Sequence, residues 1–461
     1  MALSRVFVAN RGEIAVRVLR ACGELGIETV LGVSEADRHS LGARLADRVV
    51  CIGPASADQS YLRIEALVVA AIGTGADAVH PGYGFLAERA EFARACEAAD
   101  LAFVGPPPDA IDQMGDKLRA RKIAERAGIP VVPGSQEIGT GEEALALAEG
   151  IGYPILLKAS AGGGGRGIKV VAGPEELPGA LAVATAEVMS AFGDPRIYIE
   201  RYVASARHIE VQVLADELGN VISLGERDCS LQRRYQKLVE EAPAVLPSMA
   251  PTDAAVLQER IQEAAVLLAH EISYRNAGTV EFIVDQDSGE FFFLEMNTRI
   301  QVEHPVTEEI TGVDLVAEQL RIAGGSPLGY AQQDVAVRGH AIECRITAEN
   351  VEAGFRPSPG LITEWLPPGG PGIRVDTHCY AGYEVPVHYD SLLAKVVARG
   401  RDRDHAIQRL RNALSGLRVA GVDTTAAFLH TLLSQPAFAE GRYDTRFVER
   451  LQAEGVGPGG G

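Results

Sequence analysis

The stretch VFVANRGEIAVRVLRACGELGIETVLGVS, residues 6–34, decides the fold class of the N-terminal third. It starts with a short β-branched run at 6–10, continues with apolar residues at helical spacing over 12–26, and returns to a β-branched run at 28–34. The same alternation continues to about residue 104. Strand–helix–strand alternation predicts a parallel sheet with helices on both faces, and ligands of such sheets gather at the carboxyl ends of the strands.

Length and composition set the broad class. The chain has 461 residues, which indicates about three domains. A formal net charge of −19 argues against non-specific nucleic-acid binding. We see no run of about 18 apolar residues, so we expect no membrane span, and the first residues do not resemble a signal peptide. The six cysteines form no C-x-x-C pair, so we expect no disulfide, no zinc site and a cytoplasmic location.

A proline cluster at 105–108 marks the end of the N-terminal module, and a new module follows it. We expect an α/β protein, α+β overall, with a C-terminal mixed α/β part that begins near GHAIECRITAE and ends in a flexible glycine-rich tail. The expected domains are an N-terminal domain at 1–115, a central domain at 116–325 with a small lobe at about 132–203, a C-terminal domain at 335–447 and the tail at 448–461.

The run KASAGGGGRGIK, residues 158–169, lies between two β-branched segments. It therefore joins two strands and differs from a Walker-type loop, which delivers phosphate to a helix N-terminus. Bare glycine backbone can approach a phosphate closely, and Lys158 at the end of the incoming strand adds a positive charge. These features favour a closing lid over a phosphate, with a simple surface hairpin as the alternative.

The strongest local signal is EMNTRIQVE, residues 295–303. Because an extended chain has a side-chain period of two, every second residue would lie on one face. Those residues are all polar, whereas the intervening ones are mostly apolar, and the row follows the apolar FFFL. The pattern predicts a functional strand face, with a solvated surface strand as the alternative; the polar residues are Glu295, Asn297, Arg299, Gln301 and Glu303.

The hairpin that precedes this row places a second carboxylate beside it. If the turn DQDSG is centred on Ser288, Glu281 lies directly across from Glu295. Directly opposed like charges destabilise a sheet, and a bound cation removes that cost. Together with Asn297 these groups offer only oxygen ligands, which suits Mg²⁺ or Mn²⁺ shared with phosphate oxygens.

Beyond the metal ligands, the row changes in character. Arg299 can bind a small planar oxyanion with two hydrogen bonds, Gln301 adds another donor, and Glu303 can act as a general base. The basic cluster at 227–237 indicates a local anion site on an otherwise acidic chain. The combination predicts phosphoryl transfer to a carboxylate-like acceptor.

Taken together, the motifs resemble the biotin carboxylase subunit of biotin-dependent carboxylases, which is built on an ATP-grasp fold. They follow the family order over residues 1–447, and the combination is far more specific than any single glycine run. The matching segments are VANRGEIAVR (8–17), HPGYGFL (80–86), MGDK (114–117), the glycine run, RHIEVQVL (207–214), RDCSLQRRYQKLVEEAPA (227–244), EMNTRIQVEHPVTE (295–308), GHAIECRI (339–346) and YDSLLAKV (389–396).

The resemblance implies roles for individual residues. It assigns ATP binding to Lys117, Lys158, Gly164, Gly165, Glu200, Arg201, Tyr202, Val203, His208, Gln232, Tyr235, Glu281 and Glu295. It assigns the metal to Glu281, Glu295 and Asn297, and bicarbonate to Lys237, Arg299, Gln301, Val302 and Glu303. It assigns biotin to Tyr83 and Arg345, supporting positions to Arg374 and Asp390, and catalysis to Arg299, Glu303, Lys237 and Arg345. From the residues alone, a solvated strand face remains an equal alternative for Arg345. Arg201 and Tyr235 depart from the lysine and histidine that the family often has.

The implied fold is a Rossmann-like N-terminal domain, an ATP-grasp domain with a mobile lid, and a C-terminal α/β domain. The implied reaction is carboxylation of biotin from ATP and bicarbonate through carboxyphosphate, with Mg²⁺ or Mn²⁺. No methionine precedes a lysine, so biotin is expected on a separate biotin carboxyl carrier protein, with a carboxyltransferase as further partner. By analogy the chain is a homodimer with Arg20 and Glu24 near the interface.

The sequence does not identify the molecule that finally receives the carboxyl group from biotin. We favour acetyl-CoA carboxylase and hence fatty acid biosynthesis. The alternatives are the biotin carboxylase component of a propionyl-CoA, pyruvate or urea carboxylase, an ATP-grasp ligase with a different acceptor such as an amine, and a catalytically silent scaffold.

Overall fold

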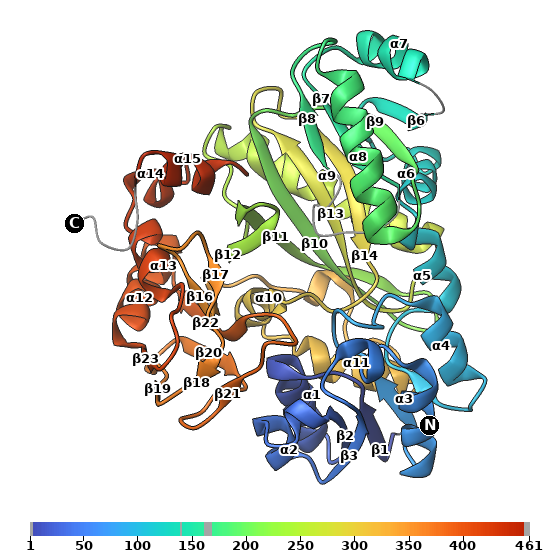
Figure 1. Cartoon of the computed structure of the whole chain (residues 1–461), viewed down its shortest axis with the longest axis vertical. Coiled ribbons are helices and arrows are strands. Elements are labelled where there is room, and N and C mark those ends of the chain that lie inside the picture. The colour runs from blue at the N-terminus through green and yellow to red at the C-terminus, as the bar shows by residue number, and fades with distance from the viewer. Residues whose placement is uncertain (1–2, 139–140, 161–167, 456–461) are drawn as a thin grey trace.

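The computed structural model describes residues 3–138, 141–160 and 168–455. Figure 1 shows the N-terminal part in blue at the bottom, a small lobe in green at the top, and the C-terminal part in orange and red at the left. A long sheet runs between them, with strands that change in colour from light green through yellow to orange.

The N-terminal part has the parallel sheet that the alternation predicted. Its strand order is β3-β2-β1-β4-β5, and every pairing is parallel. The strands are β1 (Arg5–Val8), β2 (Glu28–Ser34), β3 (Arg48–Gly53), β4 (Ala78–His80) and β5 (Ala102–Phe103). The helices are α1 (Gly12–Glu24), α2 (Leu41–Leu45), α3 (Ile64–Gly73) and α4 (Ala90–Glu97), and α5 (Pro108–Gly115) and α6 (Lys117–Arg126) lead into the central part.

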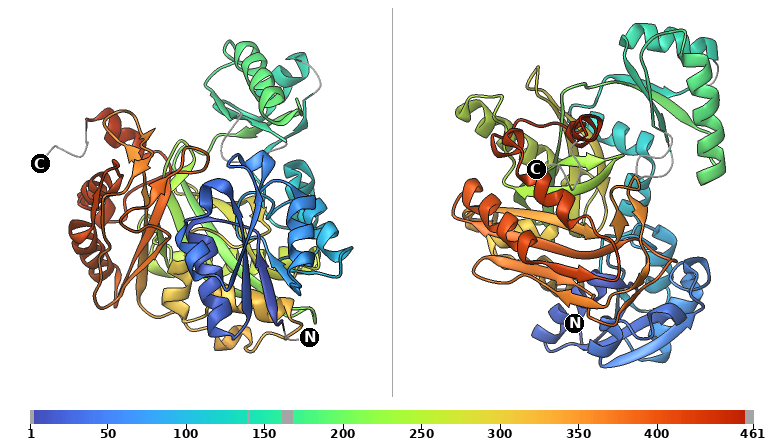
Figure 2. Two further views of the ribbon diagram at one scale, coloured as in Figure 1. Left: turned by 60° about the horizontal axis from the view of Figure 1, so that its bottom comes forward. Right: turned by 60° about the vertical axis from the view of Figure 1, so that its left-hand side comes forward.

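The small lobe, residues 134–201, projects from the molecule in both views of Figure 2. Its antiparallel sheet has the order β6-β9-β7-β8, with β6 (Gly134–Glu137), β7 (Ile155–Ala159), β8 (Lys169–Val171) and β9 (Ile197–Arg201), and its helices are α7 (Gly141–Ile151) and α8 (Leu177–Phe192). The segments before and after the glycine run pair antiparallel, so the run joins two strands as predicted. The strand expected near IPVVPG lies later, because Val131 forms only an isolated bridge to Phe293.

One eight-stranded antiparallel sheet spans the central and C-terminal parts. Its order is β14-β13-β10-β11-β12-β15-β22-β20. The strands are β10 (Ala206–Ala215), β11 (Val221–Arg233), β12 (Gln236–Ala242), β13 (Asn276–Asp285), β14 (Phe291–Asn297), β15 (His340–Thr347), β20 (Ile373–Thr377) and β22 (Leu392–Gly400). The β12–β15 pairing, in which Val239 faces Cys344, unites the two parts in a single sheet.

The two faces of this sheet differ in polarity. One face is apolar: it packs in the central part against α9 (Pro251–Glu271), and in the C-terminal part against α12 (Arg403–Gly416), α13 (Ala426–Leu433) and α15 (Phe447–Ala453). The opposite face carries most of the predicted site residues and meets α10 (His304–Thr311), whose Val306 packs on Ala341. Because side chains alternate along a strand, an apolar face dictates the positions of the polar one.

The remaining elements are short. They are α11 (Leu315–Ala323), α14 (Pro436–Ala439) and the paired strands β16 (Glu349–Asn350) with β17 (Arg356–Pro357), β18 (Gly360–Leu361) with β21 (Glu384–Val385), and β19 (Glu364–Leu366) with β23 (Arg418–Ala420). The flexible tail was expected from residue 448, which is wrong for its first part. Helix α15 continues to Ala453, because Val448 and Leu451 are buried in the C-terminal core.

Candidate active site

A row of charged side chains crosses four strands in register. Glu295 on β14 faces Glu281 on β13, Glu281 faces Glu210 on β10, and Glu210 faces Arg227 on β11. The predicted pairing of Glu281 with Glu295 is therefore confirmed. Three carboxylates side by side on adjacent strands repel one another, so this row needs cations to be stable.

Lysine and arginine side chains supply part of that charge. Lys237 Nζ lies 2.6 Å from Glu210 Oε2, 3.0 Å from Glu281 Oε1 and 2.6 Å from Glu303 Oε1. Arg227 Nε lies 2.5 Å from Glu210 Oε1. Both cations belong to the basic cluster of the sequence, and these two face carboxylates inside the protein, whereas Arg234 of the same cluster is exposed.

Two further basic side chains approach the same row. His208 Nε2 lies 2.8 Å from Glu281 Oε2, and Lys117 Nζ lies 2.9 Å from Glu295 Oε2. Burial lowers the pKa of His208, the Glu281 carboxylate raises it, and the net shift is upward. Basic groups therefore lie against Glu281 and Glu295, the two carboxylates predicted to bind a metal.

The prediction that residues 295–303 form one extended strand is wrong. Strand β14 ends at Asn297, and a loop leads to α10. The Thr298 N–H bonds to Glu88 Oε1 at 3.2 Å and not to the neighbouring strand, and Pro305 favours the first turn of the helix.

The polar side chains of this row still converge. Arg299 Nη2 donates to Asn297 Oδ1 at 2.9 Å, and Arg299 Nη1 donates to Gln301 Oε1 at 2.7 Å. Gln301 Nε2 and Asn297 Nδ2 both donate to Glu281 Oε1, at 2.9 and 2.8 Å. The loop thus brings together the groups that the period-two argument placed on one strand face.

Glu303 lies between two cations. It immediately precedes α10, its side chain is 0% exposed, and it accepts from Lys237 Nζ at 2.6 Å and from Arg345 Nη2 at 2.7 Å. Burial alone would raise the pKa of Glu303. The positive charges of Lys237 and then Arg345 lower it, and the net result is a pKa well below the usual range. Glu303 is therefore a carboxylate at neutral pH, as a general base must be.

Arg345 does not lie on a solvated strand face, which was the alternative from sequence. Its side chain is 17% exposed, and its Nε donates to Glu240 Oε1 at 2.5 Å.

Val302 lies next to Glu303 in the loop, and its carbonyl accepts from Lys395 Nζ at 2.9 Å.

Some of the predicted nucleotide residues lie in the small lobe, namely Lys158 on β7 and Glu200 and Arg201 on β9. Lys158 Nζ donates to Glu200 Oε2 at 2.8 Å, and Arg121 Nη1 donates to Glu200 Oε1 at 2.8 Å. In the predicted adenine hinge, the N–H groups of Arg201 and Tyr202 bond to the carbonyls of Pro133 and Pro154, and Val203 follows them. Gly164 and Gly165 lie outside the described residues.

The turn between β11 and β12 sets the position of Lys237. Gln232 is buried and faces Lys237 in register. The two-residue turn has positive φ at Arg234 (49°) and Tyr235 (65°), a conformation that suits a tight hairpin. The Tyr235 side chain is half-exposed at the tip of this hairpin.

Sequence reasoning missed two groups near Lys237, Glu210 and Glu240, and it noted Arg227 only as part of the basic cluster. Glu210 had a usable signal, because His208, Glu210 and Gln212 alternate with apolar residues in HIEVQVL. The same period-two rule that singled out residues 295–303 would have selected it.

Glu343 and Glu240 form a second pair of opposed carboxylates, on β15 and β12. Both are fully buried, and neither oxygen of Glu343 has a hydrogen-bond partner within the described segments. Burial raises the pKa of Glu343 well above its ordinary value, the Lys395 ammonium opposes this, and the Glu240 carboxylate adds to it. Burial likewise raises the pKa of Glu240 to about 7, against the opposing effect of Arg345.

Glu343→Gln is expected to remove a pH-dependent loss of stability. An acid whose pKa is raised on folding binds more protons folded than unfolded, so stability falls as pH rises between the unfolded and folded pKa values, by about 1.4 kcal/mol per pH unit. Glutamine does not titrate. Denaturant unfolding at pH 5 to 9 should show the variant gaining on the wild type as pH rises. Parallel stability curves would contradict the assignment.

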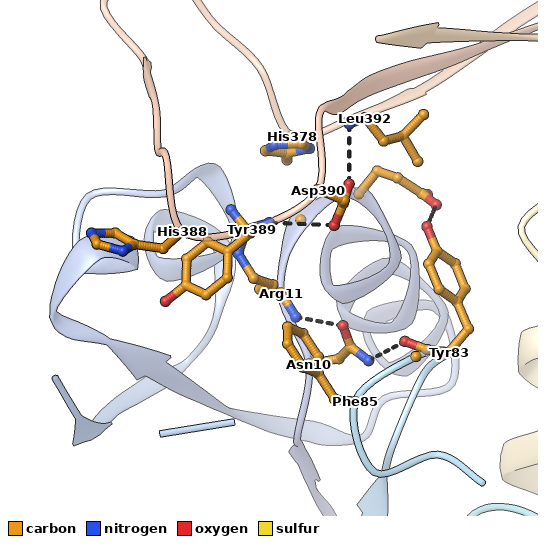
Figure 3. A pocket seen from close by; sticks show the side chains of 12 residues that line it. Asn10, Arg11, Tyr83, Phe85, His378, His388, Tyr389, Asp390 and Leu392 are labelled. Carbon is orange, nitrogen blue, oxygen red and sulfur yellow. Dashed lines mark hydrogen bonds and ion pairs between the residues drawn. The ribbon is translucent and has the colours of Figure 1, made fainter. Parts of the chain in front are cut away.

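A cavity of about 280 Å³ opens where the N-terminal and C-terminal parts meet (Figure 3). Tyr83 and Asp390 both line it, with Arg11, His378 and Tyr389. Figure 3 shows Asp390 beside Arg11, and the Tyr83 hydroxyl donates to Glu13. Arg345 is not among the lining residues. Arg374, the other supporting position, bonds to Asp376 and Glu308.

The class of protein follows from comparison with known families. Residues 116–331 match the model described as "Carbamoyl-phosphate synthase L chain, ATP binding domain", which marks an ATP-grasp ligase, and this range contains the small lobe and strands β10 to β14 of the long sheet. Residues 2–111 match "Biotin carboxylase, N-terminal domain", and residues 343–450 match "Biotin carboxylase C-terminal domain".

Whole-chain relatives narrow the class. Biotin carboxylase 1 of Bacillus subtilis is 51% identical over 98% of this chain and 100% of its own. A pyruvate carboxylase component from Methanothermobacter thermautotrophicus is 51% identical over 97% of this chain and 90% of its own. The chain belongs to the biotin carboxylase family.

Solved structures agree with this membership. The biotin carboxylase domain dimer of Hydrogenobacter thermophilus 2-oxoglutarate carboxylase, in complex with MgADP, ADP and bicarbonate, superposes with a TM-score of 0.93 at 47% identity, covering 98% of each chain. The biotin carboxylase–β,γ-ATP complex of Campylobacter jejuni gives 0.93 at 44% identity, covering 97% of this chain and 99% of that one. Among the described helices, none is both long and apolar enough to cross a membrane.

Proposed function

We propose that the chain uses ATP and bicarbonate to carboxylate biotin on a separate carrier protein. The observation that carries the proposal is the position of Glu303. It is an ionised carboxylate held between Lys237 and Arg345, and the same Lys237 ammonium also contacts Glu210 and Glu281. A base, an anion-binding arginine and a cation site within one cluster are the parts that phosphoryl transfer to bicarbonate needs.

The residues fit a divalent cation. Glu281, Glu295 and Asn297 present only oxygen ligands once the Asn297 amide turns, and Glu281 and Glu295 face each other directly across the hairpin. We assign the metal to these three residues. When bound, Mg²⁺ or Mn²⁺ would neutralise charge on the phosphates of ATP.

In the proposed reaction, Glu303 removes the proton of bicarbonate, which Arg299, Gln301, Lys237 and the Val302–Glu303 backbone hold. A bicarbonate oxygen attacks the γ-phosphorus of ATP, and the bond to the ADP oxygen breaks. Carboxyphosphate then separates into CO₂ and phosphate. The phosphate takes the N1′ proton of biotin, Arg345 stabilises the resulting enolate, and N1′ attacks CO₂.

Nucleotide binding is proposed at Lys117, Lys158, His208 and the 200–203 hinge, with the lobe at about 132–203 as lid within a central domain of 116–325. Biotin is proposed to contact Tyr83, which lines the cavity shown in Figure 3, and Arg345, which does not line it. The N-terminal and C-terminal domains are proposed at 1–115 and 335–447.

For the holoenzyme, we propose acetyl-CoA carboxylase in the cytoplasm, with a biotin carboxyl carrier protein and a carboxyltransferase. A pyruvate carboxylase is the second candidate, because a pyruvate carboxylase component is as similar to this chain as a biotin carboxylase is. A homodimer is proposed through α1, where Arg20 and Glu24 are both exposed.

The decisive test is ADP release by the wild-type chain. It should require bicarbonate and rise with free biotin. ADP release that ignores biotin and responds to an amine or amino acid would overturn the proposal in favour of another ATP-grasp ligase. Mass spectrometry of a biotinylated partner captured with the chain would distinguish the two candidate holoenzymes.

A further inference from the structure

Lys395 on β22 is a buried cation outside the proposed set of catalytic residues. Its side chain is 0% exposed. Its Nζ lies 3.1 Å from Glu13 Oε1 and 3.9 Å from Asp376 Oδ2, and it donates to the Val302 carbonyl at 2.9 Å. A buried ammonium is costly unless it is paired, so these contacts are fixed features of the interior.

The contact with Val302 fixes a particular peptide group. A trans peptide is planar, and its C=O and N–H point to opposite sides. Lys395 binds the carbonyl of the Val302–Glu303 peptide, so the N–H of Glu303 points away from Lys395. Within the described residues, neither that N–H nor the N–H of Val302 has a protein acceptor. Two backbone donors are thus left for an anion beside the Glu303 carboxylate.

The same lysine also reaches the biotin side of the site. Glu13 on α1 accepts from Lys395 and from the Tyr83 hydroxyl through the same oxygen, Oε1. Its other oxygen has no partner within the described segments. A continuous chain of contacts therefore runs from Tyr83 through Glu13 and Lys395 to the Val302 carbonyl.

We propose that Lys395 is a positioning residue for the loop at residues 301–303, which is proposed to bind bicarbonate. Lys395 holds the Val302–Glu303 peptide so that the Glu303 carboxylate and the free N–H groups of Val302 and Glu303 face one anion. Through Glu13, it also connects this loop to Tyr83. The inference rests on the proposed function. It predicts an effect on bicarbonate that is separate from the effect on ATP, because the polar partners of Lys395 within the described segments include none of the proposed ATP residues.

A matched control is available in Arg403. Its Nε lies 2.6 Å from Glu241 Oε2, so it also pairs with a buried carboxylate of the long sheet. Its other partners are the carbonyls of Phe438 and Ala439, away from the 301–303 loop. Arg403→Met therefore removes a buried ion pair, which should lower stability, but it leaves the contact between Lys395 and the Val302 carbonyl unchanged.

The experiment measures ADP release with free biotin, and the KM values for bicarbonate and ATP, in the full chain. Lys395→Met is expected to lower kcat/KM for bicarbonate by on the order of 10- to 100-fold with KM for ATP within about twofold, as a small misplacement of reacting groups does. Lys395→Arg should restore part of the loss. Arg403→Met should lower thermal stability and leave KM for bicarbonate unchanged.

Glu13→Gln covers the case in which Lys395→Met does not fold. It keeps the side-chain shape and removes the charge that faces Lys395, so KM for bicarbonate should rise in the same direction by a smaller factor. An unchanged KM for bicarbonate in the folded variants overturns the inference. If the wild type shows no bicarbonate-dependent ADP release, the proposed function itself has failed, which is a separate result.

Discussion

Glu303→Gln is expected to lower bicarbonate-dependent ADP release by about 10³-fold while ATP still binds. General-base catalysis contributes roughly 10²- to 10⁴-fold, and glutamine cannot accept the bicarbonate proton. Glu303 lies against Lys237 and Arg345 and not against the predicted nucleotide residues Lys117 or Lys158, so the nucleotide site should survive. Turnover and ATP affinity are measured separately, by ADP release and by equilibrium titration.

The pH profile of the wild type provides a second check on Glu303. Its pKa is held well below the ordinary value, so the active carboxylate form is present at every pH above that low pKa. Glu303 should therefore cause no loss of activity between pH 6 and 8, and its acid limb should lie below about pH 4.5. A variant that loses ATP affinity and retains turnover when saturated would show that Glu303 serves the nucleotide.

Glu281→Gln is expected to lower turnover by at least about 10²-fold and to raise the Mg²⁺ concentration needed for half-maximal activity. Glu281 accepts from Lys237, Asn297 and Gln301, and it faces Glu295 across the hairpin. Removing its charge takes away a proposed metal ligand and leaves Lys237 with one fewer carboxylate, and a lost metal-site charge weakens binding strongly. Mn²⁺ binding in the presence of ATP can be followed by electron paramagnetic resonance.

Glu226→Gln is the matched control for that variant. Glu226 is also a buried carboxylate of the long sheet, but its oxygens accept from Gln258 and Gln262 of α9, on the opposite face. The control should leave the Mn²⁺ titration unchanged. Equal Mn²⁺ binding by wild type and Glu281→Gln would remove Glu281 from the metal site and revive the interpretation of the chain as a catalytically silent homologue.

The sequence predicted features that depend on local pattern. The parallel N-terminal sheet followed from alternating strand and helix periodicity. The pairing of Glu281 with Glu295 was predicted from symmetry about Ser288; beside the turn the strands pair one residue off that register, as Val284 with Phe291, and a β-irregularity between Glu281 and Phe282 restores it. The strands around the glycine run were likewise evident from their β-branched residues. In each case the interacting residues are near in sequence, so the local residue pattern is enough to predict which strands pair.

What the sequence did not predict depends on distant segments. The loop after Asn297 leaves the sheet because Thr298 bonds to Glu88, more than two hundred positions earlier. Lys237 joins Glu210, Glu281 and Glu303 from three separate elements, and no local periodicity relates those positions. The family resemblance selected Lys237 and Arg345 together with their partners Glu281 and Glu303, but it did not supply Glu210 and Glu240, the other carboxylates that hold them.

Because β12 of the central part pairs with β15 of the C-terminal part, neither part is expected to fold correctly when it is expressed without the other. A chain cut between the central and C-terminal parts would leave β12 as an unprotected edge, with unpaired N–H and C=O groups along residues 239–242 open to other chains. Such edges invite aggregation. The two parts therefore cannot be treated as interchangeable modules, and the strand that carries Arg345 is joined to the central part by a β-ladder.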